Sequence, residues 1–491
     1  MSGPLGSSQW MYNAGGDFYP TTIDNSLRFN GSNSTLTKSV SHNRKTFTIS
    51  FWTKRSNVDR RMIYGAYNNG ASTSAIEIDT NGLAYYNYVG GYTAHLRTNA
   101  LLRDVSAWYH IVLAVDTTQS TSSNRLKLYV NGEQVTSFLF EVYPSQNADM
   151  IFGSGITHAV GTEGTNTRLV WDGYLADYCL IDGQALDPTS FGEFKSGVWV
   201  AKDVSGLTFG SGGYYLKFDG NSNDSSGNGN NWTANNISAH DYMPDSPTNN
   251  FNTFSTVIPT NQGTRSEGNL KSASVSGGSS SYGPMSCYNV HSGKWYFEFR
   301  ITGGTAADIY AGAFYARLDN TIRFGKDMAI VYNGLIYGGG SVVQSGLPNP
   351  ATNDVFGFAV DVDNSTCQIY RNGSTYGNLV NFSSSSYVSN GFMGMGHYHG
   401  SSSSNSTVVV NYGQDSTFAG ATTAGGNADD NGLGDFKYAP PSGFLAMCSQ
   451  NLPELAIDPA NDDTSEDHFN PVIWSGNSTD GRDIVTGHAT D

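Results

Sequence analysis

Residues 114–132 read Ala-Val-Asp, a polar turn and then Leu-Lys-Leu-Tyr-Val-Asn-Gly, and this pattern decides the fold. Residues 359–373 repeat it, with Ala-Val-Asp followed by Cys-Gln-Ile-Tyr-Arg-Asn-Gly. In each copy an alternating strand ends in Asn-Gly, the dipeptide that favours tight β-hairpin turns. The leucine or isoleucine of each strand is predicted to face one side, and the tyrosine that follows it the other. Two copies far apart in the chain indicate two β-sandwiches of related design.

The composition narrows the classes of partner. The 491 residues contain 26 Lys and Arg against 42 Asp and Glu, which gives a net charge of −16. An acidic chain repels a phosphate backbone, so we expect no nucleic-acid partner. No apolar run reaches the roughly 20 residues of a membrane span, so we expect no membrane insertion. Residues 1–7 lack the features of a signal peptide, and they read either as native sequence or as a protease-cleavage scar.

We predict an all-β chain with two tandem sandwiches, an extended connector and a weakly ordered acidic C-terminal tail. Apolar islands inside the tail, at 440–447 and 469–474, need another surface to cover them, so we expect them to dock. The predicted parts are an N-terminal arm (1–20), a first sandwich (21–200), an irregular connector with one or two strands (201–285), a second sandwich (286–420) and the acidic tail (421–491).

The first sandwich resembles the laminin-G-like, concanavalin-A-like jelly-roll family. The resemblance is carried, in order, by Phe47-Thr48-Ile49-Ser50-Phe51-Trp52, Trp108-Tyr109-His110-Ile111, Leu128-Tyr129-Val130-Asn131-Gly132, and Gly173-Tyr174-Leu175-Ala176-Asp177 followed by Ile181-Asp182-Gly183.

The second sandwich resembles the SPRY family. The motifs that carry this resemblance are Lys294-Trp295-Tyr296-Phe297-Glu298, Gly357-Phe358-Ala359-Val360-Asp361, the Asp363-Asn364 turn, Tyr370-Arg371-Asn372-Gly373 and Asn411-Tyr412-Gly413.

The laminin-G-like block is followed by the SPRY-like block, and then by Pro-Pro-Ser-Gly-Phe-Leu-Ala (440–446) before Asn451-Leu452-Pro453. This whole layout resembles virion proteins of marine and other environmental tailed bacteriophages. That resemblance implies a non-enzymatic part of the particle surface: a tail fibre, a receptor-binding adhesin or a head decoration. It implies synthesis in the cytoplasm of the bacterial host and other virion proteins as partners of the N-terminal arm or the C-terminal tail. For the sandwich loops it implies host surface glycan or a neighbouring virion protein as the ligand. It also implies a homo-oligomer, with a trimer favoured.

The sequence leaves two other functions open. A glycan-cleaving depolymerase could use the same jelly-roll scaffold, and Glu77 and Asp79 lie two apart on one predicted strand. Retaining glycosidases need two carboxylates about 5 Å apart, and the second glutamate of the jelly-roll glycosidase motif is missing after Asp79. We therefore predict that Glu77 and Asp79 lie on a solvated strand face, and we predict no catalytic residue. An intracellular SPRY recognition module is the other alternative, although its usual helical partner domains are missing.

The candidate ligand-binding stretch is 85–92, where tyrosines alternate with asparagine and glycine. On an exposed loop, tyrosine rings stack on sugars and asparagine bonds to their hydroxyls; on a strand, half of the rings belong to the core. The candidate ligand-binding residues are Tyr85, Tyr86, Asn87, Tyr88 and Tyr92.

The chain needs no cofactor on this reading, but calcium is one candidate. Asp219, Asn221, Asn223 and Asp224 present hard oxygens at alternating spacing, which calcium prefers. The same residue types are preferred in turns, and that alternative stays open.

A second metal candidate is the pair His397 and His399. The two imidazoles share one face of a strand or lie close together in a loop, and two ligands are too few for a metal ion. The axis of a trimer would multiply the pair to six ligands, as in phage fibres to which this motif is similar. Plain surface or core histidines are the alternative.

Overall fold

The structure is a computed structural model of the 491-residue chain. It describes residues 18–165, 168–256, 264–273, 286–288, 290–304, 309–315, 329–339, 341–382, 392–399 and 406–453. Within these ranges the secondary structure is β-strand with four short 3-10 helices, so the predicted all-β class is confirmed. No described helix is long and apolar enough to cross a membrane. The 3-10 helices are η1 (Ser122–Asn124), η2 (Pro188–Ser190), η3 (Ala239–Asp241) and η6 (Ser449–Asn451).

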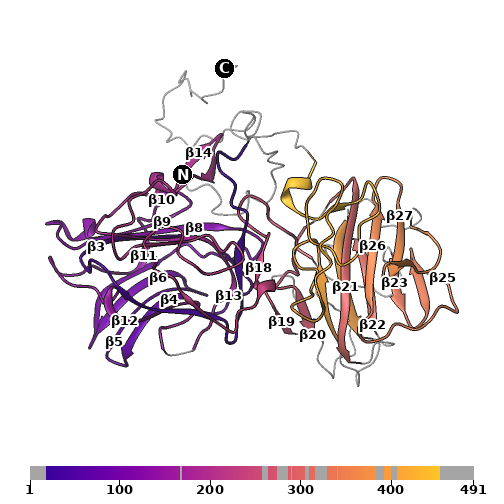
Figure 1. Cartoon of the computed structure of the whole chain (residues 1–491), viewed down its shortest axis with the longest axis horizontal. Helices are drawn as coiled ribbons and strands as arrows, with labels where there is room; N and C mark the ends of the chain where they lie inside the picture. Colours follow the sequence, from indigo (N-terminus) through magenta and orange to yellow (C-terminus); the bar gives the residue numbers. More distant parts are fainter. Residues whose placement is uncertain are drawn as a thin grey trace, which may run out of the picture.

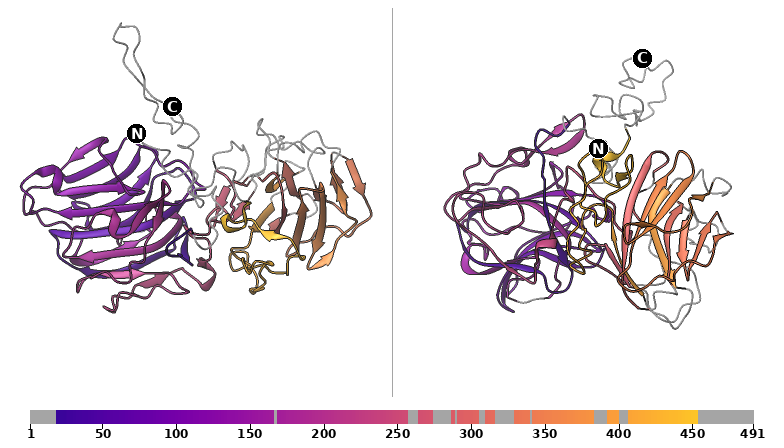
Figure 2. Two further views of the ribbon diagram at one scale, coloured as in Figure 1. Left: turned by 90° about the horizontal axis from the view of Figure 1, so that it is seen from above. Right: turned by 45° about the vertical axis from the view of Figure 1, so that its right-hand side comes forward.

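Two sandwiches lie side by side, as Figure 1 and both views of Figure 2 show. The first is built from two sheets of eight strands each. Sheet 1 runs in the order β10 (Glu133–Gln134), β9 (Leu126–Val130), β8 (Tyr109–Asp116), β3 (Thr46–Arg55), β13 (Asp172–Asp182), β1 (Ser26–Asn30) and β18 (Tyr242–Met243), with β16 (Tyr214–Leu216) also paired to β13. Sheet 2 runs in the order β11 (Phe138–Val142), β7 (Tyr92–Thr98), β6 (Gly82–Val89), β5 (Ser72–Asp79), β4 (Arg61–Asn69), β12 (Ser154–Val160), β2 (Thr35–Ser41) and β17 (Thr233–Asn235).

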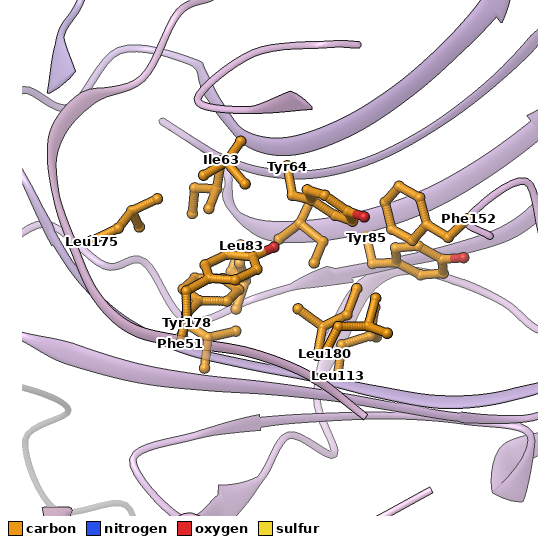
Figure 3. Packing of buried hydrophobic residues seen from close by; sticks show 14 of the residues in the cluster. Phe51, Ile63, Tyr64, Leu83, Tyr85, Leu113, Phe152, Leu175, Tyr178 and Leu180 are labelled. Carbon is orange, nitrogen blue, oxygen red and sulfur yellow. The ribbon is translucent and has the colours of Figure 1, made fainter. Parts of the chain in front are cut away.

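The core of the first sandwich lies between its sheets. Phe51 and Tyr178 stack from sheet 1, with ring centroids 5.2 Å apart. Tyr64 and Tyr85 enter from sheet 2, and Figure 3 shows them around Phe152. Burying such large rings supplies most of the hydrophobic stabilisation of a sandwich, because the gain is roughly proportional to the apolar area removed from water.

Residues 185–210 cover the outer face of sheet 1. Phe191 and Phe209 pack there on Cys179 and Tyr215. The hairpin of β14 (Gly192–Lys195) and β15 (Val198–Ala201) adds a second patch, on which Phe18 and Tyr19 pack. The end of the predicted N-terminal arm therefore docks on its own chain, and residues 1–17 lie outside the described residues.

The second sandwich also has two sheets. Sheet 3 runs in the order β19 (Thr264–Ser266), β20 (Lys271–Ala273), β31 (Ser406–Asn411), β21 (Lys294–Gly304), β26 (Val355–Asp361), β27 (Thr366–Arg371) and β28 (Ser374–Thr375), with β29 (Val380–Asn381) on β27 and β32 (Leu445–Ala446) on β21. Sheet 4 runs in the order β25 (Ser341–Gln344), β24 (Leu335–Gly338), β23 (Ala329–Tyr332), β22 (Ile309–Tyr315) and β30 (Phe392–His399).

The two Asn-Gly hairpins form as predicted. Asn131 and Gly132 join β9 to β10, and Asn372 and Gly373 join β27 to β28. All four residues have positive φ, between 48° and 82°, which is the region that two-residue hairpin loops require. Each asparagine side chain also accepts a backbone N–H, from His110 of β8 in the first hairpin and from Val355 of β26 in the second. These hydrogen bonds join each turn to the neighbouring strand of its sheet.

The predicted connector divides between the sandwiches. Its described residues hold five strands rather than one or two: β16, β17 and β18 complete the first sandwich, while β19 and β20 extend sheet 3. Each is only two or three residues long, too short for alternation to reveal it in the sequence.

Part of the predicted tail packs on the second sandwich. Ala446 and Met447 are buried, as the apolar island at 440–447 predicted. The Glu298 carboxylate accepts the backbone N–H groups of Lys437 and Tyr438, both at 2.8 Å, and so fastens the segment to β21. Burial raises the pKa of Glu298 to about 7. The island at 469–474 lies outside the described residues.

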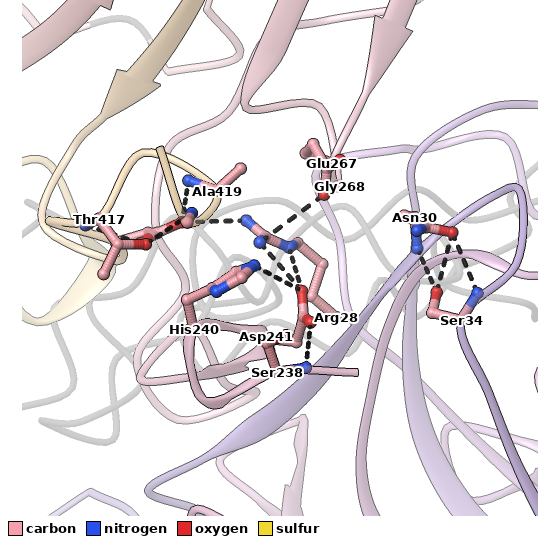
Figure 4. Close-up of polar contacts among 12 residues, drawn as sticks. Arg28, Asn30, Ser34, Ser238, His240, Asp241, Glu267, Gly268, Thr417 and Ala419 are labelled. Atoms are coloured by element: carbon pink, nitrogen blue, oxygen red, sulfur yellow. Dashed lines mark hydrogen bonds and ion pairs between the residues drawn. The ribbon is translucent and has the colours of Figure 1, made fainter. Parts of the chain in front are cut away.

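The contact region between the two sandwiches, around Arg28 and Tyr174, is called the seam here, and its side chains are buried like those of a core. Arg28, on β1, is fully buried and pairs with Asp241 at 3.0 Å and with Asp415 of the second sandwich at 3.2 Å. Glu267 lies 3.7 Å from the same guanidinium, and Figure 4 shows Asp241 and Glu267 beside Arg28. The Tyr174 hydroxyl donates to the Gly268 carbonyl across the seam at 2.7 Å. The two sandwiches are thus joined by buried polar contacts as well as by apolar packing.

A second buried cation lies in the same region. Lys54, on β3, donates to Asp245 and, at 2.8 Å, to Asn250. The ammonium also lies 4.8 Å from the centre of the Tyr174 ring. Burial lowers the pKa of Lys54 and raises that of Asp245, and the pairing opposes both shifts.

Candidate functional site

The candidate stretch 85–92 forms most of β6 and the start of β7, so its side chains alternate between two faces of sheet 2. Tyr85 is 0% exposed and lies in the core, where Figure 3 shows it. Asn87 is also buried: its Nδ2 donates to Thr93 and its Oδ1 accepts from Ile151. Of the two alternatives that the sequence left open, the strand applies here: Tyr85 and Asn87 point inward, because the period of a strand turns alternate residues to the core side.

Tyr86, Tyr88 and Tyr92 lie on the outer face of sheet 2. Tyr92 is 54% exposed, and its ring stacks on His95 with centroids 4.5 Å apart. Phe140, 51% exposed, stacks on the other side of His95 at 5.1 Å, and Tyr88 meets Tyr92 edge-on at 5.3 Å. We call Tyr88, Tyr92, His95 and Phe140 the aromatic face.

Strand register brings these rings together. Tyr86 pairs with His95, and His95 pairs with Val142 on the edge strand β11. Residues directly opposite one another in an antiparallel sheet share a face, so β6, β7 and β11 each contribute a ring to one outer row. The aromatic face therefore ends at an edge of the sheet, where a ligand can reach it from two sides.

A paired charge cluster lies beside the aromatic face. Glu77 on β5 is fully buried and accepts from Arg60 at 2.7 Å and from Arg97 at 2.8 Å. Arg97 also pairs with Asp79. Glu77 and Asp79 do share a strand face, as predicted, but the prediction that this face is solvated is wrong. Glu77 is 0% and Asp79 7% exposed, because one guanidinium bridges both carboxylates and neutralises them below the surface.

Tyr86 bonds to a third buried carboxylate, that of Glu163. Its hydroxyl donates to Glu163 at 3.2 Å, and Thr73 donates to the same oxygen at 3.1 Å. Arg168 bonds the other oxygen of Glu163 at 2.6 Å. Burial and the nearby Glu163 carboxylate raise the pKa of Tyr86. These bonds fix the tyrosine ring beneath the exposed rings of the aromatic face.

His95 is neutral over the usual pH range. Burial, and after it the Arg97 cation, lower the pKa of His95 to about 4. Its Nε2 is buried and has no hydrogen-bond partner among the residues that the structure describes. The imidazole therefore acts as an uncharged ring between Tyr92 and Phe140.

The predicted calcium ligands serve as turn residues. Asp224 accepts the backbone N–H groups of Tyr215, Ser226 and Asn230, each within 2.9 Å. Asn221 accepts from the backbone of Asn223 and donates to the carbonyl of Asp219. The alternative that the sequence left open, a polar turn, accounts for these contacts. Within the described ranges no group of three or more His, Cys, Asp or Glu side chains could hold a metal ion.

His397 and His399 both lie on β30, opposite Ala311 and Ile309 of β22. The strand placement agrees with the first of the two predicted arrangements. The metal prediction for this pair remains untested, because their side chains lie outside the described residues.

Sequence reasoning missed half of the aromatic face. His95 and Phe140 stand on other strands, and nothing in their own segments marks them as partners of Tyr92. The one available signal was the apolar run Phe138-Leu139-Phe140 in a polar neighbourhood, which is typical of a contact surface.

Comparisons with known proteins agree with this architecture. The sequence profile of the "Concanavalin A-like lectin/glucanases superfamily" matches residues 29–189, about a third of the chain, including the whole aromatic face. No characterised protein sequence matches the chain.

The chain is also similar to several solved structures. The heptameric SAP-like pentraxin from Limulus polyphemus is 16% identical over 34% of this chain and 79% of its own, with a TM-score of 0.27. The SPRY domain of human HERC1 is 18% identical over 29% and 87%, with a TM-score of 0.24. Domains LG4-5 of the mouse laminin alpha1 chain are 11% identical over 80% and 88%, with a TM-score of 0.29.

Proposed function

We propose that the chain is a non-enzymatic binding protein that holds a glycan on the aromatic face of its first sandwich. The observation that carries the proposal is the stack of Tyr92, His95 and Phe140, whose outer rings are half exposed. The apolar faces of pyranose rings pack on exposed aromatic rings, while nearby polar groups bond to the hydroxyls. The concanavalin-A-like lectin/glucanase profile over residues 29–189 supports this class of ligand.

The proposal extends to the setting of the protein. The order of the motifs, a jelly roll, a SPRY-like sandwich and an acidic tail, resembles tailed-bacteriophage virion proteins, so we place the chain at the surface of a phage particle. It would be made in the host cytoplasm and assembled as a homo-oligomer, with a trimer favoured. Host surface glycan would be the ligand, and other virion proteins would contact the terminal segments. Light scattering of the purified chain tests the oligomeric state. Mass spectrometry of purified particles tests whether the chain belongs to a phage particle.

Glycan binding is tested with two variants on the aromatic face and one beside it. Tyr92→Ala and Phe140→Ala should each weaken binding to arrayed bacterial surface glycans about tenfold, since an aromatic contact contributes roughly 0.5–1.5 kcal/mol beyond its buried area. Leu139→Ala is the matched control: Leu139 is 52% exposed on the same strand, but it is not one of the stacked rings.

The control should bind within twofold of the unmodified chain. Equal binding by the Tyr92→Ala/Phe140→Ala double variant would remove the aromatic face from the proposal. Shortened glycan products that disappear in Glu77→Gln would favour the depolymerase instead.

A further inference from the structure

A small polar pocket lies on the outer side of sheet 1, in the opposite layer of the first sandwich from the aromatic face. Its volume is about 170 Å³, and residues 21–25 close one side of it. Asp177 and Tyr215 line it from β13 and β16, and Lys202, Asp203 and Lys217 also contribute. This volume is below the ~300 Å³ of ordinary drug-sized sites, so the pocket suits a single small molecule.

Asp177 reaches the pocket because β13 bulges. The register of β13 against β3 shifts between Ala176 and Cys179, and Asp177 has a φ of 50°. A β-bulge re-aims the side chain of the extra residue, and a left-handed conformation costs on the order of 1 kcal/mol outside glycine. The fold thus holds a carboxylate in the lining of the pocket, in a left-handed backbone conformation.

The carboxylate of Asp177 is only partly satisfied. The residue is 7% exposed, and one of its oxygens accepts from the Tyr215 hydroxyl. Among the residues that the structure describes, no other donor reaches the Asp177 side chain. Lys217 acts on the charge of Asp177 from nearby, but it donates no hydrogen bond to it, so the second carboxylate oxygen is left for a positively charged donor.

Two lysines line the pocket, and neither donates a hydrogen bond to Asp177. The Lys217 ammonium lies 5.5 Å from the centre of the Tyr215 ring, and Lys202 donates to the Thr189 carbonyl at 3.2 Å. Three further carboxylates line the same pocket, so the acidic groups outnumber the two lysines; they are Asp24, Asp203 and Asp219.

We infer that this pocket binds the primary ammonium group of a small ligand, with the free oxygen of Asp177 as its acceptor. An ammonium group carries three N–H donors, which suits the Asp177 carboxylate and a rim that carries further carboxylates. The site is independent of the proposed glycan site, since the two lie on different sheets of the sandwich.

Acid should weaken this binding. Burial raises the pKa of Asp177 to about 6, and the groups that act on its charge are Tyr215 on β16, Lys217 after it and Asp203 after β15. Lys202, Asp24 and Asp219 line the same pocket. Below about pH 6 the carboxyl gains a proton and loses the charge that attracts the ammonium group.

The test compares ethanolamine with ethylene glycol, which replaces the ammonium group by a hydroxyl at almost the same size. Saturation-transfer NMR on the full chain at pH 7.5 should show saturable binding of ethanolamine, with ethylene glycol at least tenfold weaker. Asp177→Asn should abolish the ethanolamine signal, and Asp149→Asn, an exposed carboxylate outside the pocket, should leave it unchanged. Equal binding of the two probes, or full binding by Asp177→Asn, would overturn the inference.

A second variant keeps the test decisive if Asp177→Asn fails to fold. Lys217 is exposed, and Lys217→Gln removes a positive charge from the pocket, so ethanolamine should bind at least twofold tighter. A gain in affinity cannot come from loss of structure, and unchanged or weaker binding would contradict the inference. Tyr92→Ala should keep ethanolamine binding, which separates failure of this site from failure of the glycan site.

Discussion

The seam and the aromatic face both gather charged and aromatic side chains, yet they differ in what covers them. At the seam, Arg28 and Lys54 are buried, and the second sandwich contributes Asp415 to the pairing. At the aromatic face, Glu77 and Arg97 pair below the surface while Tyr92 and Phe140 stay half exposed. Buried pairing holds one body to another, whereas exposed rings on a paired support leave contact area for a ligand.

This difference teaches how to separate a structural site from a binding site in the same sandwich. Removing a seam residue should cost stability and leave glycan binding intact in the folded fraction. Removing an exposed ring should cost binding with little effect on stability.

The largest expected effect is at Arg28. Arg28→Met leaves Asp241 and Asp415 buried without their cation, and breaking a buried ion pair in this way typically costs ~3–5 kcal/mol of unfolding free energy. Urea denaturation measures the loss, and limited proteolysis shows whether the seam opens. The control is Arg44→Met, since Arg44 is 38% exposed and 3.9 Å from Asp149. The control variant should lower the free energy of unfolding by less than ~1 kcal/mol. A similar loss in both variants would show that the buried ion pairs of Arg28 stabilise the chain no more than an exposed pair does.

The next effect concerns Lys54 and Asp245. Lys54→Met alone should destabilise the chain by a few kcal/mol, because Asp245 is then buried without a cation. In the double variant Lys54→Met/Asp245→Leu most of this loss should return, because well-packed apolar residues can replace a buried pair at little cost. A double-mutant cycle from chemical denaturation measures the coupling. If the double variant is as unstable as the single one, the loss does not come from the unpaired charge of Asp245.

The smallest effect is expected at His95. The folded pKa of His95 is about 4, below its ordinary value of 6.5, so between these values the unfolded chain binds a proton that the native chain does not. The contribution of His95 to stability is therefore full above pH 6.5 and is lost as the pH falls towards 4. His95→Phe cannot take up this proton, so its stability should decline less than that of the unmodified chain over this window.

Thermal unfolding from pH 7 to 4 measures this difference. His95→Phe should also keep glycan binding, because a phenyl ring preserves the stack between Tyr92 and Phe140. Loss of binding with normal stability would show that the imidazole nitrogens, rather than the ring stack, contact the ligand.

Local patterns were sufficient for the strands and hairpins. Asn131-Gly132 and Asn372-Gly373 could be predicted because their conformation depends on the two residues themselves and on the strands next to them. The alternation of Tyr85 and Tyr86 was visible, but the sequence alone did not say which of the two faced the core. That choice depends on Phe152 and Tyr178, which lie far away in the sequence and fill the space beside Tyr85 and across the sandwich.

The amino-acid sequence determined that this chain folds into two β-sandwiches with acidic, polar surfaces, because alternation, turn residues and charge act over a few neighbouring positions. Only the tertiary structure decided which rings form the aromatic face, where Arg28 finds its carboxylates and that Asp177 points into a pocket. Each of these depends on the register between strands or on contact between sandwiches, and such pairings join residues whose separation along the chain carries no local signal.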